Sequence, residues 1–448
     1  KCQQIQRNLM KIKTKQQARF TIGSYKPYKP QNLQMDNTSD VLARIDNVFT
    51  PSQPISVREL FAGRSKEIEK SMEAIVEKGG HLIIYGDRGV GKTSLANILR
   101  AIISTGMENN EINIYCTYKV CNSYESFEGL WEKTLNELKT SQKIENQKIG
   151  FPIENEETNE QRIEVGLGTI LKNRTSGKIE ISDICDFLKE INENFIFIFD
   201  EFDRLTSKEV KEKFSYMLKM LSDTNNKITI ILVGIAQDIH EIIENHESVE
   251  RCLKQVHIPR MPDKELKELI EKGETLAGIK FNDEIKNKII NFSEGFPQYI
   301  HLLCKYAANE ATKRNSETIE EKDLKASVEK SIENIQETIK NKYRVAVKVI
   351  GNNKTNKFKP VLFACAFAKT DEYGYFTSKD VQHPLKIVGH EMTIKQYGYH
   401  LSQLCKEEKG EILEKLDTSS QYSYKFKNPL VKAYIKIKAY QEGIEEEI

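Results

Sequence analysis

Over its first 260 residues the chain alternates short apolar runs with longer amphipathic stretches. Unbroken apolar runs at residues 81–85, 195–199 and 228–233 predict strands that are buried on both faces of a parallel sheet. A fourth strand is predicted at residues 111–120. Helices are predicted at residues 56–78, 124–138, 182–191 and 207–222, and a further helix directly after residue 93. Ser182 is expected to cap the helix at 182–191. Strands that alternate with helices indicate a three-layer α/β fold.

Two stretches of this half lack such a pattern. Residues 1–45 have the appearance of a tail, and Pro51 and Pro54 mark a linker after it. Residues 140–160 are polar and irregular, which predicts an insertion or a mobile loop.

From residue 263 the strand pattern stops and helical periodicity takes over. It predicts a small all-helical lid from segments at residues 263–276, 282–292, 298–313 and 320–343. A polar break at 351–357 leads to helices at 359–367, 377–386 and 393–407, strands at 412–416 and 421–426, and a final helix after Pro429. Three helices followed by a β-hairpin are typical of a winged-helix domain.

These patterns predict four parts. They are a basic N-terminal tail and linker (1–50), an α/β core (51–262), a helical lid (263–345) and a winged-helix domain (355–440).

The strongest chemical signal lies between the first strand and the helix after it. A glycine-rich segment in this strand-to-helix context predicts a phosphate-binding P-loop, since glycines let backbone N–H groups wrap a phosphate at the positive end of a helix dipole. Lys92 is expected to contact the β- and γ-phosphates and act in catalysis, and the Thr93 hydroxyl to bind Mg²⁺. The predicted nucleotide-binding segment is Gly86, Asp87, Arg88, Gly89, Val90, Gly91, Lys92, Thr93 and Ser94. The alternative is a glycine-rich turn that matches by chance.

A second signal follows the apolar run at residues 195–199. Asp200 and Glu201 come directly after it, at the carboxyl end of a predicted buried strand. We expect Asp200 to hold Mg²⁺, through water, and Glu201 to polarise the attacking water. Plain solvated loop acids are the alternative.

Composition excludes some classes of protein. The 448 residues are 39% hydrophobic and 30% charged, which suits two or three ordered domains. Net charge is +1, so any nucleic-acid surface must be local. Eight scattered cysteines without a close pair favour a reduced, cytoplasmic setting, and no apolar run is long enough to span a membrane.

Local basic regions occur at both ends. The first 35 residues hold eight basic residues and no acid, which fits a DNA- or lipid-binding arm, a solvated tail or an organelle presequence. Residues 393–440 hold nine lysines and five acids. In a DNA-binding winged helix, Lys395 and Gln396 would lie on the groove-facing third helix, and Lys425 and Lys427 would reach phosphates from the wing. Packing against a protein is the alternative.

Four further segments accompany the P-loop. They read FAGRSKE at 61–67, GIAQD at 234–238, SVER at 248–251 with VHIP at 256–259, and SEGFPQ at 293–298. With the P-loop and the acidic strand end, they resemble the Orc/Cdc6-type AAA+ ATPases and the neighbouring signalling NTPases called STAND, over about residues 57–434. The resemblance implies an α/β AAA+ parallel-sheet P-loop NTPase core with an all-helical lid and a C-terminal winged helix.

The resemblance also implies roles for single residues. Phe61, with Val57 and Leu60, would contact the adenine. Gln237 would act as the sensor of the γ-phosphate or water, with a side chain one methylene longer than the usual Asn. Arg251 would be the arginine finger that completes the site of a neighbouring subunit.

The segment at 293–298 departs from the Orc/Cdc6 pattern. Gln298 stands where those relatives usually have an arginine, which removes one positive charge from the phosphates. Pro297 instead matches STAND proteins, in which the proline packs near the nucleotide. The resemblance therefore implies slow hydrolysis, with the lid distinguishing ATP from ADP by closure.

The function implied is a switch that binds and hydrolyses ATP with Mg²⁺, assembles with copies of itself or AAA+ partner subunits when ATP is bound, and binds duplex DNA through the winged helix. In the alternative, the chain is a STAND-like signalling or defence ATPase whose winged helix is autoinhibitory or binds a protein. A transposition-type ATPase regulator that assembles on DNA is a third alternative.

Overall fold

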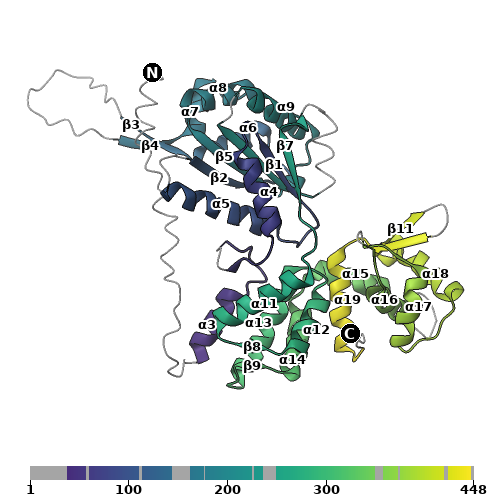
Figure 1. Cartoon of the computed structure of the whole chain (residues 1–448). Coiled ribbons are helices and arrows are strands. Elements are labelled where there is room, and N and C mark those ends of the chain that lie inside the picture. The colour runs from purple at the N-terminus through teal and green to yellow at the C-terminus, as the bar shows by residue number, and fades with distance from the viewer. Residues whose placement is uncertain are drawn as a thin grey trace, which may run out of the picture.

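The computed structural model describes ten segments of the chain. They are residues 38–56, 60–109, 114–143, 162–175, 177–224, 227–235, 249–348, 357–371, 374–417 and 422–444. The basic arm predicted over the first 35 residues lies outside them. Figure 1 shows an α/β domain, a helical lid below it and a third, C-terminal domain beside the lid.

A five-stranded sheet forms the centre of the α/β domain. All its neighbouring strands are parallel. Their order across the sheet is β2 (Ile114–Val120), β5 (Asn194–Asp200), β6 (Ile228–Gly234), β1 (His81–Tyr85) and β7 (Leu253–His257). The three strands predicted from apolar runs are confirmed, whereas β7 was missed because polar residues interrupt its pattern.

Each central strand is buried on both faces, because helices cover both sides of the sheet. Ile196 and Ile198 of β5 pack into the core that includes α4 (Ser65–Val76) and α5 (Lys92–Asn109). Phe195, Phe197 and Phe199 face the other way, into an aromatic core around Trp131. That core also includes side chains from α6 (Phe127–Asn136), α7 (Leu167–Arg174), α8 (Ile181–Ile191) and α9 (Lys208–Thr224). The predicted three-layer arrangement is therefore confirmed.

Several predicted boundaries were wrong. The helix expected from residue 56 starts only at Ser65, because Gly63 and Arg64 have positive φ values of 64° and 60°. Ser182 is not the cap of α8, which begins one residue earlier with a capping box formed by Glu180 and Asp183.

The polar stretch expected to be irregular from residue 140 begins with a strand. β3 (Lys139–Lys143) pairs antiparallel with β4 (Arg162–Gly166), so this part of the prediction was wrong. The remainder, residues 144–161, lies outside the described part of the chain.

The lid consists of α11 (Asp263–Ala277), α12 (Asp283–Ser293), α13 (Pro297–Lys313) and α14 (Glu321–Asn334). Two short strands, β8 (Lys280–Phe281) and β9 (Thr318–Ile319), pair within it, so the prediction of an all-helical lid was wrong in this detail. The single helix expected over 320–343 is two helices, because the chain is extended at Ile335 before α15 (Glu337–Val347).

The lid also includes a helix that was predicted to be tail. α3 (Thr38–Val48) lies beside α11 and α13 (Figure 1). Asp46 pairs with Lys305 of α13 at 3.0 Å, and the buried Phe49 ring packs edge-on to Phe281.

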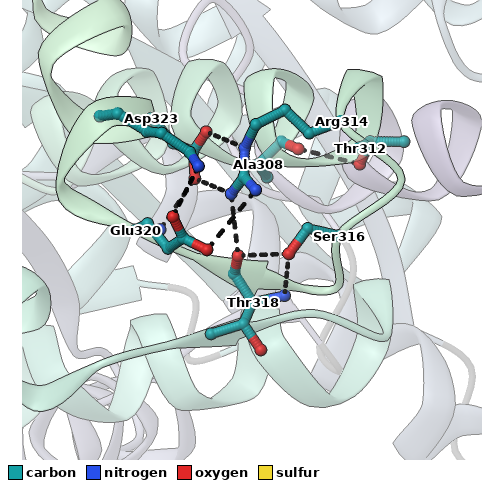
Figure 2. A network of polar contacts seen from close by, with 8 residues as sticks. Ala308, Thr312, Arg314, Ser316, Thr318, Glu320 and Asp323 are labelled. Carbon is teal, nitrogen blue, oxygen red and sulfur yellow. Dashed lines mark hydrogen bonds and ion pairs between the residues drawn. The ribbon is translucent and has the colours of Figure 1, made fainter.

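A polar network fixes the turn between α13 and α14. Figure 2 shows Arg314 reaching the carboxylate of Asp323, with donor–acceptor distances of 2.9 Å from Nε and 2.6 Å from Nη2. Asp323 is buried and also accepts a hydrogen bond from the backbone N–H of Glu320, which closes the capping box of α14. Because the carboxylate has both a fork-shaped cation and a backbone donor, its burial is compensated.

The C-terminal domain begins with α16 (Phe358–Phe367), β10 (Phe376–Thr377), α17 (Ser378–Ile387) and α18 (Ile394–Leu404). It ends with the hairpin β11 (Leu413–Asp417) and β12 (Tyr422–Phe426) and with α19 (Pro429–Gln441). β10 pairs with β12, so the predicted hairpin becomes a three-stranded sheet. This is the order of elements expected for a winged helix. Across the described segments, no helix is long and apolar enough to cross a bilayer.

Candidate functional site

The P-loop joins β1 to α5 and has the backbone shape that phosphate binding needs. A Cβ on Gly86 would lie 2.3 Å from the carbonyl oxygen of Ile258, so any side chain there would clash. Gly91 has φ +99°, a conformation that favours glycine, and open space in front of it. The amino group of Lys92 donates to the carbonyl oxygens of Gly86 at 3.0 Å and Asp87 at 2.9 Å. The charge is therefore held inside the loop.

Acidic groups surround this lysine. Burial lowers the pKa of Lys92, and the carboxylates of Asp203, Asp200 and Asp87 oppose that shift. Asp200 is the last residue of β5 and is 3% exposed. Asp203 was given no role from the sequence, and the fold brings it near the P-loop.

Both oxygens of Asp200 have donors. Oδ1 accepts from the backbone N–H of Glu201 at 2.8 Å, and Oδ2 accepts from the hydroxyl of Tyr118. Burial and this hydrogen bond raise the pKa of Tyr118, so it stays protonated and remains a donor. The Asp200 carboxylate is therefore fixed in direction before any metal binds.

Two adjoining cavities lie between the sheet and the lid. The larger, about 540 Å³, is lined by Lys92, Thr93, Asp200 and Glu201 from the α/β domain and by Pro297 and Gln298 from the lid. The smaller, about 40 Å³, is a narrow space lined mostly by apolar side chains, among them Leu60, Phe61 and Pro297. A polar cleft joined to an apolar one has the chemistry that suits phosphates in the first and a base in the second, and the apolar space has to widen to admit a base.

The segment at residues 49–56 crosses this site and ties its two walls together. The N–H of Ile55 donates to Ser94 Oγ on α5 at 3.1 Å. The N–H of Thr50 donates to Nδ1 of His301 on α13 at 3.3 Å. Burial lowers the pKa of His301 to about 4, so the ring is neutral at pH 7 and can accept this bond.

Arg64 of the FAGRSKE segment joins three parts of the site. Its guanidinium donates to the carbonyl oxygens of Val90 in the P-loop at 3.3 Å and of Pro259 after β7 at 2.6 Å. Its backbone N–H donates to Glu265 of lid helix α11 at 3.2 Å. Burial lowers the pKa of Arg64, and Glu67 and Glu265 oppose the shift. The segment therefore lines the cavity and also joins the P-loop, the residues after β7 and the lid.

The C-terminal domain contacts both the P-loop and the lid. A Cβ placed on Gly89 of the P-loop would lie 3.2 Å from Leu430 Cδ2, so α19 lies against the P-loop. The Tyr299 hydroxyl on α13 donates to the carbonyl oxygen of Leu430 at 2.9 Å.

One turn further along α19, a buried ionic cluster joins it to the lid. Glu294, at the end of α12, pairs with Lys436 at 2.5 Å and Lys432 at 2.8 Å, and more weakly with Arg260 at 3.7 Å. Burial raises the pKa of the Glu294 carboxyl, but the two lysines outweigh it and bring the pKa to about 2. We call these four residues the Glu294 cluster.

Other predicted residues lie apart from this site or outside the described segments. Gln237 and Val57 are outside them. Arg251 is exposed just before β7, where it lines a separate cavity of about 220 Å³ at the opposite end of the strands from the P-loop. It therefore lies apart from its own chain's nucleotide cleft, and its role as an arginine finger stays a prediction.

Most of the predicted DNA contacts are engaged within the domain. Lys425 pairs with Glu414 at 3.3 Å and Lys427 with Glu411 at 2.6 Å. Gln396 accepts a hydrogen bond from the N–H of Thr393 at 2.9 Å, which caps α18. Lys395 is exposed, beside Tyr399, whose side chain is 61% exposed.

Comparison with known proteins decides the family. Residues 55–371 match the family model described as Novel STAND NTPase 1. The chain belongs to this family of STAND NTPases. The match spans the P-loop, the acidic strand end and the lid of the STAND NTPase, and it confirms the resemblance drawn from its motifs.

The fold of the STAND NTPase also resembles solved structures. The Aeropyrum pernix ORC2 protein is 14% identical, with 88% of this chain and 98% of that chain covered and a TM-score of 0.47. A Walker-type ATPase of Pyrococcus abyssi is 17% identical, with 86% of this chain and 99% of that chain covered and a TM-score of 0.48. The A. pernix ORC1 protein, solved in complex with DNA, is 12% identical, with 88% and 97% covered and a TM-score of 0.44. A comparison with curated proteins found no match.

Sequence reasoning missed Tyr118, Arg204 and His301. Tyr118 lies on β2 two residues before its end, so a strand order that places β2 beside β5 would have located it next to Asp200. Arg204 lines the larger cavity and pairs with Glu201, and its spacing of three residues from Glu201 was a signal that the two side chains could meet. His301 follows Pro297 by one helical turn, which was a signal that it also faces the cleft.

Proposed function

We propose that this STAND NTPase is a switch that binds and hydrolyses ATP with Mg²⁺ in the cleft between sheet and lid. The donor set fits these ligands: a P-loop with a lysine, a serine/threonine hydroxyl at the start of its helix and a fixed carboxylate facing it. Mg²⁺, when bound, would neutralise phosphate charge.

In this proposal each residue has one task. Lys92 binds the phosphates together with the backbone from Gly86 to Ser94, and Thr93 and Asp200 hold the metal. Glu201 accepts a proton from the attacking water. Phe61 and Pro297 pack around the base, in the smaller cavity that both of them line.

The observation that carries the switch is the contact of α19 with both halves of the site. Leu430 lies on the P-loop, while the Glu294 cluster holds α19 to the lid. A change in the position of the lid therefore moves Glu294 relative to the lysines, and the C-terminal domain is released or held accordingly. This favours the autoinhibited arrangement implied by the STAND resemblance.

The charge of Glu294 provides the test. Glu294→Gln removes the buried carboxylate that Lys432 and Lys436 share, at a cost of about 3 kcal/mol to the docked arrangement. We expect the variant to expand in small-angle X-ray scattering and to release a fluorescent ADP analogue several-fold faster than the parent chain.

The matched control replaces Glu294, Lys432 and Lys436 together by methionine. Apolar side chains of similar length can fill the same space, so this triple variant should stay compact and release ADP slowly. Equal scattering and equal release rates for Glu294→Gln and the parent chain would contradict the proposed latch.

Assembly is the second part of the proposal. Arg251 is exposed before the start of β7, at the opposite end of the strands from the P-loop, so it does not act in its own cleft. ATP bound in the cleft of one copy, whether of this chain or of an AAA+ partner, would attract that arginine and favour assembly.

Duplex DNA is a second candidate ligand, favoured by the exposed face of α18. Ile394, Lys395 and Tyr399 are exposed there, and Figure 1 shows α18 on the part of the C-terminal domain that lies away from the nucleotide cleft. Lys425 and Lys427 would have to exchange their glutamate partners for phosphates.

Fluorescence anisotropy with a labelled duplex, at two salt concentrations and with ATP, ADP or no nucleotide, tests this candidate. Replacing Lys395, Lys425 and Lys427 by alanine should weaken binding and reduce the slope of log K against log salt by about 3. The control triple Lys264, Lys267 and Lys280, exposed on the lid, should leave the slope unchanged. Absence of binding in every nucleotide state would leave the protein-regulated switch as the function.

A further inference from the structure

Glu201, the proposed base, is held in an ion pair by a residue of its own turn. Phe202–Arg204 form one turn of 3-10 helix directly after it, and the N–H of Arg204 donates to the carbonyl oxygen of Glu201 at 2.9 Å. The Arg204 side chain then folds back. Its Nε lies 2.9 Å from Glu201 Oε2, and its Nη2 lies 3.2 Å from Oε1.

This contact occupies both carboxylate oxygens. A guanidinium that donates to each oxygen occupies one of the two in-plane lone pairs on each, and in-plane lone pairs are the ones a base offers to a water proton. While the pair is formed, the Glu201 carboxylate is held against Arg204, and two of its lone pairs are not available to an attacking water.

The backbone favours this pose. Glu201 has φ +54°, in the left-handed region, and Asp200 Oδ1 stabilises it by accepting from the Glu201 N–H. The side chain of Glu201 is thereby directed over its own turn towards Arg204. Both side chains line the larger cavity.

The pair is formed in an open part of the cleft, so it can also break. The Arg204 side chain is 52% exposed and that of Glu201 is 38% exposed. Exposed ion pairs are weak, and a pair of this kind leaves the free form of its carboxylate populated to a minor extent.

We propose that Arg204 is a positioning residue that withholds Glu201 from water and thereby keeps the resting hydrolysis rate low. This proposal rests on the proposed function, since it takes Glu201 as the base. It gives slow hydrolysis a second physical cause beside Gln298, and one that is reversible, because the pair breaks without any change in the fold.

The test is Arg204→Ala, measured as steady-state ATP turnover of the full chain. Removing the pair frees the carboxylate, so kcat should rise by about 5-fold while KM for ATP stays unchanged. A lysine at this position would hold the carboxylate less firmly than the two-pronged guanidinium does. The kcat of Arg204→Lys should therefore lie between those of the parent chain and Arg204→Ala. Lys208→Ala, on the exposed start of α9, is the control and should turn over ATP as the parent chain does.

A second measurement does not depend on turnover. Thermal unfolding midpoints of Glu201→Gln, Arg204→Ala and the double variant should be non-additive, because the pair is lost in either single variant. Additive midpoints would overturn the pairing itself.

The outcomes separate this proposal from the proposed function. If Glu201→Gln abolishes turnover but Arg204→Ala leaves kcat unchanged or lowers it, Arg204 does not withhold the base and the proposed function stands. If Glu201→Gln turns over ATP as fast as the parent chain, Glu201 is not the base, and both assignments fall. A kcat gain in Arg204→Ala that disappears in the double variant supports both.

Discussion

Replacing Glu201 by glutamine is expected to leave ATP binding intact and to lower turnover by about 100-fold or more. A glutamine has the same size but cannot accept a proton from water, and general-base catalysis of this kind contributes 100-fold or more to a rate. The measurement is binding of a fluorescent ATP analogue beside steady-state phosphate release.

The chain offers a matched control for this experiment. Glu193 precedes β5, at the opposite end of the strand that ends in Asp200, and it is also partly exposed. Glu193→Gln changes the same functional group without touching the cleft, so both binding and turnover should match the parent chain. Undiminished hydrolysis in Glu201→Gln would remove Glu201 from its assigned role.

Replacing Lys92 by alanine is expected to weaken ATP binding by about 100-fold. The amino group is the cation that the P-loop holds inside its curve, and charge-assisted bonds to phosphate are among the strong polar contacts in proteins. Loss of that charge also removes the amino group that offsets the negative charges of Asp200 and Asp203 near the phosphates. Titration with the same ATP analogue measures the effect.

Lys78 supplies the control for this second experiment. It is exposed and lies before β1, so it is at the other end of the strand that leads into the P-loop. Lys78→Ala should bind ATP with the affinity of the parent chain. Equal affinity in Lys92→Ala would mean that the phosphates are bound elsewhere.

The two predictions separate binding from chemistry. A chain that loses binding with Lys92→Ala and turnover with Glu201→Gln is an ATPase at this cleft. A chain that shows the first effect but no measurable turnover in any form is a nucleotide-binding switch. The Glu294 experiment then tests the switch without any need for hydrolysis.

Local pattern was sufficient to predict the centre of the α/β domain. The apolar runs of β1, β5 and β6 are unbroken because both faces of these strands are buried, and such runs are visible without knowledge of the fold. The P-loop and the acidic end of β5 follow two of them, so the sequence also placed Lys92 and Asp200 at the same edge of one sheet.

Elements with only one buried face, or with few local signals and much contact to distant segments, were harder to predict. β7 has only two buried residues among its five positions, and they do not alternate with exposed ones, so its pattern cannot be separated from that of a loop. α3 was taken as tail because its helix depends on packing against α11 and α13 rather than on strong local signals. β3 is polar, and its pairing with β4 joins segments that lie about twenty residues apart.

By itself, then, the sequence determined the fold class, the P-loop, the acidic strand end and the order of the lid and winged-helix segments, because each depends on residues close together in the chain. Only the tertiary structure decided which side chains meet. It placed Tyr118 on Asp200, Arg204 on Glu201 and α19 on the P-loop and Glu294, through strand order, a left-handed backbone and domain packing. The first and last of these contacts join segments far apart in the chain, and the pair of Arg204 with Glu201 depends on the left-handed backbone at Glu201, which the local pattern did not show.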